Sequence, residues 1–139
     1  MSEGPEKAFR KKICTELVKH NAKIINNIQY GGQVRRGQFL TPGEPGISDV
    51  TMIHKDTGII FLEFKSSEGK LSPLQKRFLQ EVNERVPYSG FVVRENKYEK
   101  YIGDLEYIFP DGSLQMMFWR FEDAAELINH IKIAAQIRV

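Results

Sequence analysis

The sequence predicts a single α/β domain in which helices flank a mixed central sheet, with the element order αβββαβ followed by a C-terminal β-hairpin and helix. Apolar residues recur at helical spacing in three segments, and strand-like runs lie between these segments. A strand, a helix and a strand follow one another in mid-chain, an order typical of two parallel strands joined by a right-handed crossover. The chain has 139 residues, which fits one core and one domain, 1–139.

The first predicted element is an amphipathic helix. It is expected to begin at Pro5, because proline is favoured at the first helical position, and to end near His20. Its apolar face consists of Phe9, Ile13, Cys14, Leu17 and Val18. Residues 22–30 contain several β-branched side chains and predict a strand, and a long loop with a turn-dense segment at 41–46 follows it.

Two strand-like runs come next, at 48–53 and 58–65, with the polar turn 54–57 between them. Runs of this length around a short polar turn predict a β-hairpin. A helix is expected from 72 to 86, where Pro87 stops it, because proline cannot continue a helix.

The rest of the chain predicts a buried strand at 90–94, then a short helix leading into a strand around 98–109. A turn at 110–113 and a strand-like run at 114–119 follow. The last amphipathic helix is expected at 122–137. It uses Ala125, Leu127, Ile128, Ile131 and Ala135 as its apolar face.

Charged residues stand in the middle of the predicted hairpin. Side chains alternate between faces along a strand, so Glu63 and Lys65 share a face, and pairing around the turn places Asp49 opposite Glu63. Two carboxylates that face each other repel, and a divalent cation relieves that repulsion. Carboxylate oxygens without His or Cys suit Mg²⁺ or Mn²⁺ better than zinc. The same spacing also fits a structural ion pair in which Lys65 neutralises both carboxylates.

Charge is divided unevenly along the chain although the formal total is only +2. Residues 1–77 carry 13 Lys and Arg against 8 Asp and Glu, whereas residues 78–139 carry 7 against 10. A basic half points to a polyanionic partner. The one cysteine, Cys14, forms no internal disulfide or thiolate zinc site. No long apolar run or secretory signal is visible, so we expect a cytoplasmic protein without a membrane partner.

Four short segments together resemble a known family: Gly46-Ile47-Ser48-Asp49, Glu63-Phe64-Lys65, the run from Ser66 to Ser72, and Gln75. In this combination they resemble the VRR-NUC (virus-type replication-repair nuclease) family of the PD-(D/E)XK nuclease superfamily. The resemblance covers about residues 5–95 and implies a restriction-endonuclease-like core, with residues 96–139 as an accessory extension. Ser48 stands where most relatives have proline.

The resemblance also implies roles for individual residues. Asp49, Glu63 and the backbone carbonyl of Phe64 would bind Mg²⁺ or Mn²⁺, and Lys65 would position or activate the attacking water. Relatives use a glutamate on the first helix, for which Glu6 and Glu16 compete. At about 100° per residue, Glu6 lies within about 20° of Ile13 and Leu17, and Glu16 lies about 80° away at the edge of the stripe. Glu6 is therefore preferred, although it would also suit the helix dipole without any catalytic role.

Gln75 has two interpretations that are compatible. The segment Ser72-Pro73-Leu74-Gln75 fits a capping box, and the resemblance makes Gln75 a site residue. A helix that begins just after the charged strand would direct its N-terminus to the site, where a phosphate would bind. The basic residues expected to contact nucleic acid are Arg35, Arg36, Lys70, Lys76 and Arg77.

Together with the resemblance, these observations predict a metal-dependent DNA endonuclease, and the resemblance implies selectivity for branched DNA such as flaps or four-way junctions. The resemblance further implies a role in DNA repair or recombination in a bacterial or phage-infected cell, in a phage or mobile element, and two copies could pair as a homodimer. The first alternative is a nuclease-like module that binds nucleic acid without cutting it, and the second is a structural protein with an ion-paired hairpin. The histidines His20, His54 and His130 are expected at the surface.

Overall fold

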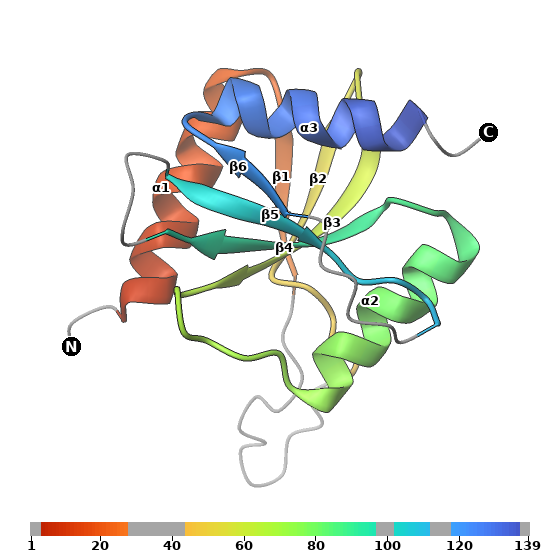
Figure 1. Ribbon diagram of the computed structural model, residues 1–139. Coiled ribbons are helices and arrows are strands. Elements are labelled where there is room, and N and C mark those ends of the chain that lie inside the picture. Colours follow the sequence, from red (N-terminus) through yellow and green to blue (C-terminus); the bar gives the residue numbers. More distant parts are fainter. Residues whose placement is uncertain (1–3, 28–43, 97–101, 112–117, 137–139) are drawn as a thin grey trace, which may run out of the picture.

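The computed structural model describes residues 4–27, 44–96, 102–111 and 118–136, which form one six-stranded sheet with three helices (Figure 1). Its strands lie side by side in chain order from β1 to β6. Only β3 and β4 run parallel, and every other neighbouring pair is antiparallel. The strands are β1 (Lys23–Asn26), β2 (Val50–His54), β3 (Gly58–Lys65), β4 (Gly90–Glu95), β5 (Gly103–Tyr107) and β6 (Phe118–Phe121). The predicted α/β class with a mixed sheet is confirmed.

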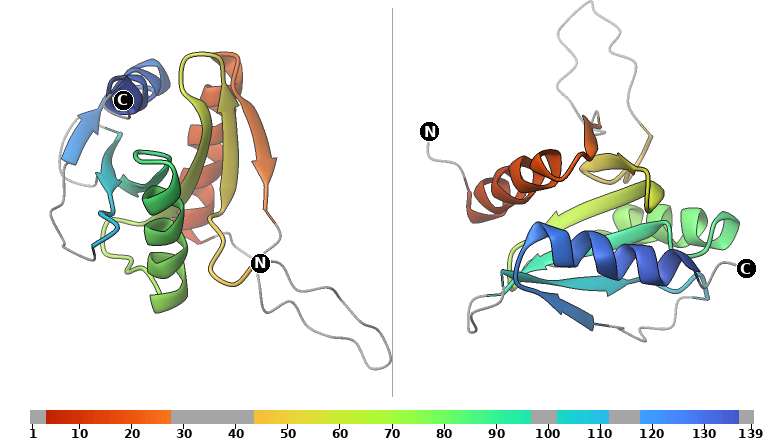
Figure 2. Two further views of the ribbon diagram at one scale, coloured as in Figure 1. Left: turned by 90° about the vertical axis from the view of Figure 1, so that its right-hand side faces the viewer. Right: turned by 90° about the horizontal axis from the view of Figure 1, so that it is seen from above.

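The helices cover both faces of the sheet. They are α1 (Pro5–Lys19), α2 (Pro73–Arg85) and α3 (Ala124–Gln136). α1 and α3 pack against each other and share one hydrophobic core, whereas α2 packs on β4 through a separate small cluster. Figure 1 shows α3 above the central strands and α2 below them, and Figure 2 shows the twist of the sheet between them. In the described part of the chain, no helix combines the length and the apolar character needed to cross a membrane.

The predicted hairpin is confirmed, including its register. β2 and β3 pair antiparallel with Val50 opposite Leu62, and continuing that register by one residue brings Asp49 to Glu63. The crossover is confirmed as well, because β3 and β4 are parallel and α2 connects them. The C-terminal end of β3 extends beyond the start of β2, so its last residues have β4 as a neighbour on one side only.

Alternation along β3 separates the core from the charged residues. Ile60, Leu62 and Phe64 are completely buried beneath α1 and α3, and Phe64 meets Phe9 edge-on at 6.1 Å between ring centroids. Burial of each such side chain contributes about 1.5–3 kcal/mol. Glu63 and Lys65 lie on the opposite face, as the alternation of side chains predicts. The core thus holds the strand that presents both charged groups.

The C-terminal strands complete the same sheet. β5 pairs with β4 and β6 pairs with β5, and Leu105 and Phe121 belong to the same core as Phe9. The expected turn is present at 110–111. Much of the expected short helix, and residues 112–117 of the turn and the next strand-like run, lie outside the described residues.

His54 differs from the expectation of a surface position. It is buried at the end of β2, where Nδ1 accepts a hydrogen bond from the Asp56 N–H and Nε2 lies 3.0 Å from the His20 carbonyl oxygen. Since Nδ1 accepts, Nε2 carries the proton and donates to that carbonyl. The ring joins the hairpin turn to the end of α1, which is a structural role.

Candidate functional site

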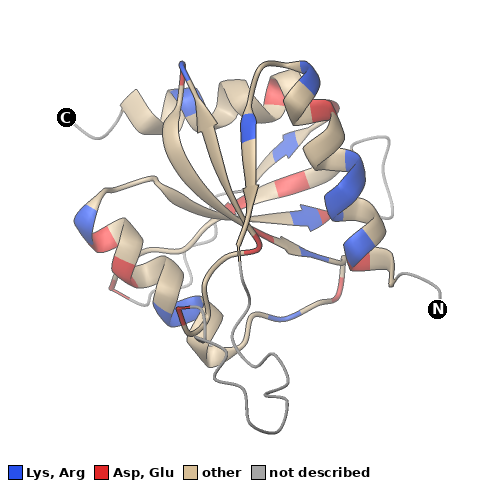
Figure 3. Ribbon diagram, turned by 180° about the vertical axis from the view of Figure 1, so that it is seen from behind, with Lys and Arg blue, Asp and Glu red and all other residues tan. Residues whose placement is uncertain are grey.

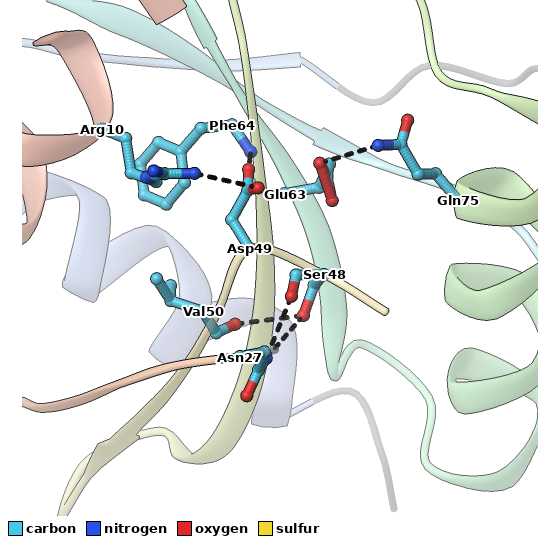
Figure 4. A network of polar contacts seen from close by, with 8 residues as sticks. All are labelled: Arg10, Asn27, Ser48, Asp49, Val50, Glu63, Phe64 and Gln75. Atoms are coloured by element: carbon cyan, nitrogen blue, oxygen red, sulfur yellow. Dashed lines mark hydrogen bonds and ion pairs between the residues drawn. The ribbon is translucent and has the colours of Figure 1, made fainter. Parts of the chain in front are cut away.

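Four elements bring the predicted site residues together. Asp49 immediately precedes β2, and Glu63 and Lys65 lie at the C-terminal end of β3. Gln75 lies in the first turn of α2, and Glu6 in the first turn of α1. Figure 4 shows Asp49, Glu63 and Gln75 converging from these separate segments. The site is therefore built where the sheet meets the N-terminal ends of two helices.

Asp49 is held by two donors, one on each oxygen. Its Oδ2 accepts from the backbone N–H of Phe64 at 2.8 Å, and its Oδ1 accepts from Arg10 Nη1 at 3.1 Å (Figure 4). The carboxylate is 9% exposed, whereas the Arg10 side chain is 29% exposed. Sequence reasoning missed Arg10. The sequence clue that could have found Arg10 is its position four residues after Glu6, because residues four apart on a helix share a face.

Glu63 is the most deeply buried acidic group of the site, with 1% of its surface exposed. Its Oε1 accepts from Gln75 Nε2 at 3.2 Å, while its Oε2 is buried and has no hydrogen-bond partner among the described residues. Burial and the adjacent charge of Asp49 raise the pKa of Glu63 to about 9; Glu6 adds to the shift and Lys65 opposes it. The positive charge of Lys65 is therefore too weak an influence to keep Glu63 ionised at neutral pH.

Lys65 is buried, with 7% of its surface exposed, on the same face as Glu63. In the part of the chain that the structure describes it makes no salt bridge with Asp49 or Glu63, and the counter-ion of Asp49 is Arg10 instead. The arrangement in which Lys65 neutralises both carboxylates as an ion pair is thus not what the structure shows. Lys65 is close enough to lower the pKa of Glu63, which leaves its ammonium group available beside the carboxylates.

Gln75 performs both of its expected tasks at once. The Ser72 hydroxyl accepts from the Gln75 N–H at 3.2 Å, and Gln75 Oε1 accepts from the Ser72 N–H at 2.9 Å. This is the predicted capping box, which satisfies backbone donors at the start of α2. The remaining amide group, Nε2, then points to Glu63. The start of α2 and the acidic site are linked through this one side chain.

The loop before Asp49 is packed directly on α2. Gly46 has a φ of +72°, and a Cβ atom there would lie 2.1 Å from the carbonyl oxygen of Leu74. Only glycine allows this close approach without displacing the backbone of the helix. Ser48 is buried and donates to the Val50 carbonyl at 3.1 Å, and Asn27 Nδ2 donates to the Ser48 carbonyl at 3.0 Å. Ser48, at the position where the resembled family has proline, thus anchors the strand entry by hydrogen bonds.

Arg94 is a second residue that sequence reasoning missed. Its Nη1 donates to the backbone carbonyls of Ser66 and Gly69, and its Nε pairs with the buried carboxylate of Glu106 on β5. Burial raises the pKa of Glu106, and Arg94 opposes that shift. Arg94 is next to Lys65 in the parallel register. The C-terminal strands therefore hold the loop that follows Lys65, and no short motif encodes such a contact.

The first-helix glutamates occupy different surroundings. Glu6 is half-buried, and its negative charge contributes to the raised pKa of Glu63. Glu16 pairs with Lys19 at 3.1 Å on the surface of the helix. Glu6 is thus the helix carboxylate whose charge acts on the site.

Of the basic residues expected to contact nucleic acid, three lie within the described part of the chain. Arg35 and Arg36 lie outside the described residues. Lys70 is exposed in the loop before α2, Lys76 is half-buried, and Arg77 pairs with Glu81 at 3.1 Å with 74% of its side chain exposed. Figure 3 shows Lys and Arg residues on α2 and in the loop before it, and a further group of them along α1. The site is flanked by positive charge from both helices.

The donor atoms suit a hard divalent cation. Within residues 4–27, 44–96, 102–111 and 118–136, no cluster of three or more His, Cys, Asp or Glu side chains could hold a metal. The metal-ligand set implied by the resemblance consists of only two carboxylates and a backbone carbonyl. The N–H and C=O of a strand residue point to the same side, so the Phe64 carbonyl faces the side on which its N–H meets Asp49. The buried, unpartnered Glu63 Oε2 completes an oxygen set that fits Mg²⁺ or Mn²⁺.

Searches against protein-family models, curated proteins and solved structures found no match to this chain.

Proposed function

We propose that this chain is a metal-dependent nuclease of the VRR-NUC type with a restriction-endonuclease-like core, which hydrolyses phosphodiester bonds in DNA. The observation that carries the proposal is the buried Glu63 Oε2, which has no partner among the described residues and lies beside Asp49. A buried carboxylate pair is costly unless a cation compensates it. The pair lies at the end of β3, next to Lys65 and the capped start of α2, where a phosphodiester could bind.

Each residue then has a distinct task. Asp49, Glu63 and the Phe64 carbonyl would hold Mg²⁺ or Mn²⁺, which when bound polarises the scissile phosphate and lowers the pKa of water. The Lys65 ammonium would orient the attacking water and offset the charge that develops on the phosphate. Gln75 keeps the Glu63 carboxylate in place through Oε1, and Glu6 would assist from α1. The orienting groups come from rigid elements, as precise positioning requires.

The preference for branched DNA, such as flaps or four-way junctions, is the finer part of the proposal. It rests on the resemblance of the motif segments, which also supports a role in DNA repair or recombination and a phage or mobile-element context. A second copy of the chain would allow cutting of both strands. Substrate comparison and the oligomeric state in solution test these points.

The direct experiment is cleavage of end-labelled DNA by the purified chain. Single-stranded, duplex, flap and four-way-junction substrates are incubated with Mg²⁺, Mn²⁺ or EDTA. We expect metal-dependent cutting that falls at least about a hundredfold in Asp49→Asn, Glu63→Gln and Lys65→Met. Glu6→Gln should also slow cutting, whereas the matched surface variant Glu16→Gln should not. Cutting that persists in EDTA or in the Asp49 and Lys65 variants would exclude the mechanism.

A nuclease-like module that binds nucleic acid without cleaving it is the second candidate. The observation that favours it is the ion pair of Arg10 with Asp49, because a metal ligand is already neutralised by a side chain. DNA binding without cutting in either metal would support this second candidate.

A further inference from the structure

We infer that Arg10 is a displaceable counter-ion of Asp49, which yields Asp49 Oδ1 to a divalent cation and then binds a phosphate of the DNA. The inference rests on the proposed nuclease function and adds to it an exchange of one cation for another. Arg10 lies outside the motif segments on which the resemblance rests. The starting observation is the contact of 3.1 Å between Arg10 Nη1 and Asp49 Oδ1.

The two oxygens of Asp49 differ in how permanently they are held. Oδ2 accepts from the Phe64 N–H at 2.8 Å, and that donor belongs to the backbone of a central strand. Among the described residues, Oδ1 is held only by the end of a long side chain from α1. A cation can therefore compete for Oδ1 without disturbing the sheet, whereas Oδ2 keeps the carboxylate oriented throughout.

Exposure shows which partner can leave. The Arg10 side chain is 29% exposed, and Asp49 is 9% exposed. A partly exposed guanidinium that turns outward gains hydration, which offsets the loss of its carboxylate partner, whereas a buried carboxylate left without any cation would be destabilised. Departure of Arg10 thus requires that another positive charge arrives at Asp49.

Charge balance at the site points the same way. Asp49 is paired with Arg10, and the carboxyl groups of Glu6 and Glu63 lie near the same site. A divalent cation supplies more charge than Arg10 does, and the two cations repel when they share one carboxylate. Arg10 would therefore be displaced from Asp49.

The displaced side chain has a natural ligand in the proposed substrate. A guanidinium group binds phosphate oxygens by two parallel hydrogen bonds, which is why arginine is frequent in phosphate sites. Arg10 lies on α1 beside the acidic site, and Lys7 is exposed one turn earlier. Arg10 would thus contribute to DNA affinity only after the divalent cation has bound.

A permanent structural ion pair makes the opposite predictions. If Arg10 simply orients Asp49, its removal weakens metal binding, because the ligand loses its orientation. Removal of Arg10 would also change DNA affinity by the same factor with and without a divalent cation. These two readouts separate the exchange from an ordinary ion pair.

The test compares the full chain with Arg10→Gln, Arg10→Lys and the control Lys12→Gln. Lys12 is exposed on the same helix, about 200° around the axis from Arg10, so the control removes the same charge from the opposite side. Mn²⁺ affinity is measured by calorimetry, and affinity for a fluorescent duplex is measured in EDTA and in Ca²⁺. We expect Arg10→Gln to bind Mn²⁺ about 3- to 10-fold more tightly than the wild type, and Lys12→Gln to bind it equally.

For DNA, Arg10→Gln should match the wild type in EDTA and bind about 10-fold more weakly in Ca²⁺. Arg10→Lys should retain most of the competition with Mn²⁺ but lose part of the DNA affinity. Unchanged or weaker Mn²⁺ binding by folded Arg10→Gln, or an equal loss of DNA affinity in EDTA and Ca²⁺, would overturn the inference alone. Absence of Mn²⁺ binding in the wild type and in Lys12→Gln would overturn the proposed function as well.

A measurement on the wild type keeps the test independent of the folding of any one variant. The side-chain Nε–H resonance of Arg10 is assigned by its absence in Arg10→Lys. Addition of Mg²⁺ should shift this resonance as the contact with Asp49 is lost. A resonance that stays in place while Mg²⁺ saturates the site would contradict the exchange.

Discussion

Gln75 Nε2 donates a hydrogen bond of 3.2 Å to Glu63 Oε1 while its own Oε1 accepts from the Ser72 N–H. One amide side chain therefore caps α2 and holds the buried carboxylate of the site. The position of the helix and the orientation of Glu63 are coupled, so a change at Gln75 should affect stability and chemistry together.

Two substitutions separate these effects. Ser72→Ala removes the cap and should lower the free energy of unfolding by about 1 kcal/mol with little change in cleavage rate. Gln75→Ala should cost a similar amount and also slow cleavage, because Glu63 Oε1 loses its donor. Denaturant unfolding and cleavage rates of both variants check this. Equal cleavage rates in the two variants would show that the bond to Glu63 is not used.

The pH dependence of stability should report on Glu63. The folded protein holds the proton of Glu63 up to about pH 9, whereas an ordinary glutamate has a pKa of 4.5, so the folded state binds more protons between these values. Stability of the metal-free protein should therefore fall as the pH rises through that range. Glu63→Gln cannot ionise and should flatten this dependence. At pH 8 we expect it to raise the stability by about 1–2 kcal/mol, or roughly 3–8 °C in Tm.

Thermal unfolding in EDTA between pH 5 and pH 9 provides the measurement, with Glu16→Gln as the control that should follow the wild type. An excess of Mg²⁺ should restore stability to the wild type at high pH and leave Glu63→Gln less affected. Parallel curves for wild type and Glu63→Gln would contradict the buried, proton-holding carboxyl.

Gly46 and Gly58 form a matched pair for testing the packing of the loop on α2. Both have a positive φ, but a Cβ at Gly46 would overlap the backbone of Leu74, whereas a Cβ at Gly58 meets open space. Gly58→Ala should cost about 1 kcal/mol through its φ alone. Gly46→Ala should cost about 2–4 kcal/mol, because steric overlap is added. Denaturant unfolding measures both, and equal losses would show that the close approach does not matter.

Cys14 should be an inert thiol. Burial raises its pKa to about 11, with Arg10 opposing the shift and Asp49 adding to it. The thiolate is the reactive form, so alkylation by iodoacetamide at pH 8 should be about a hundredfold slower than for a free cysteine. Unfolding in guanidinium should restore the ordinary rate. Fast labelling of the folded protein would contradict the raised pKa of this half-buried thiol.

Local patterns predicted much of the fold. Alternation in 58–65 and the polar turn before it correctly predicted the hairpin and placed Asp49 at Glu63, because strand register follows from the turn and the buried face. The capping box at Ser72 and Gln75 could also be predicted from the sequence, since it depends on residues three apart.

Contacts between distant segments could not be predicted in this way. Arg10 and Asp49 are 39 residues apart, and Arg94 reaches the loop after β3 from a neighbouring strand. Their meeting depends on how α1 and β4 pack on the sheet, which no local spacing encodes. The same holds for His54, whose burial results from the packing of the hairpin turn against α1.

The sequence by itself determined which residues are candidates for the proposed chemistry: two carboxylates, a lysine and a glutamine at positions set by strand alternation and helix capping. Tertiary structure alone decided their ionic state. It buried Glu63 with one oxygen unpartnered among the described residues and paired Asp49 with Arg10 rather than Lys65. The physical reason is that hydrogen-bonding patterns are local, whereas burial and charge pairing depend on every segment that packs around a group.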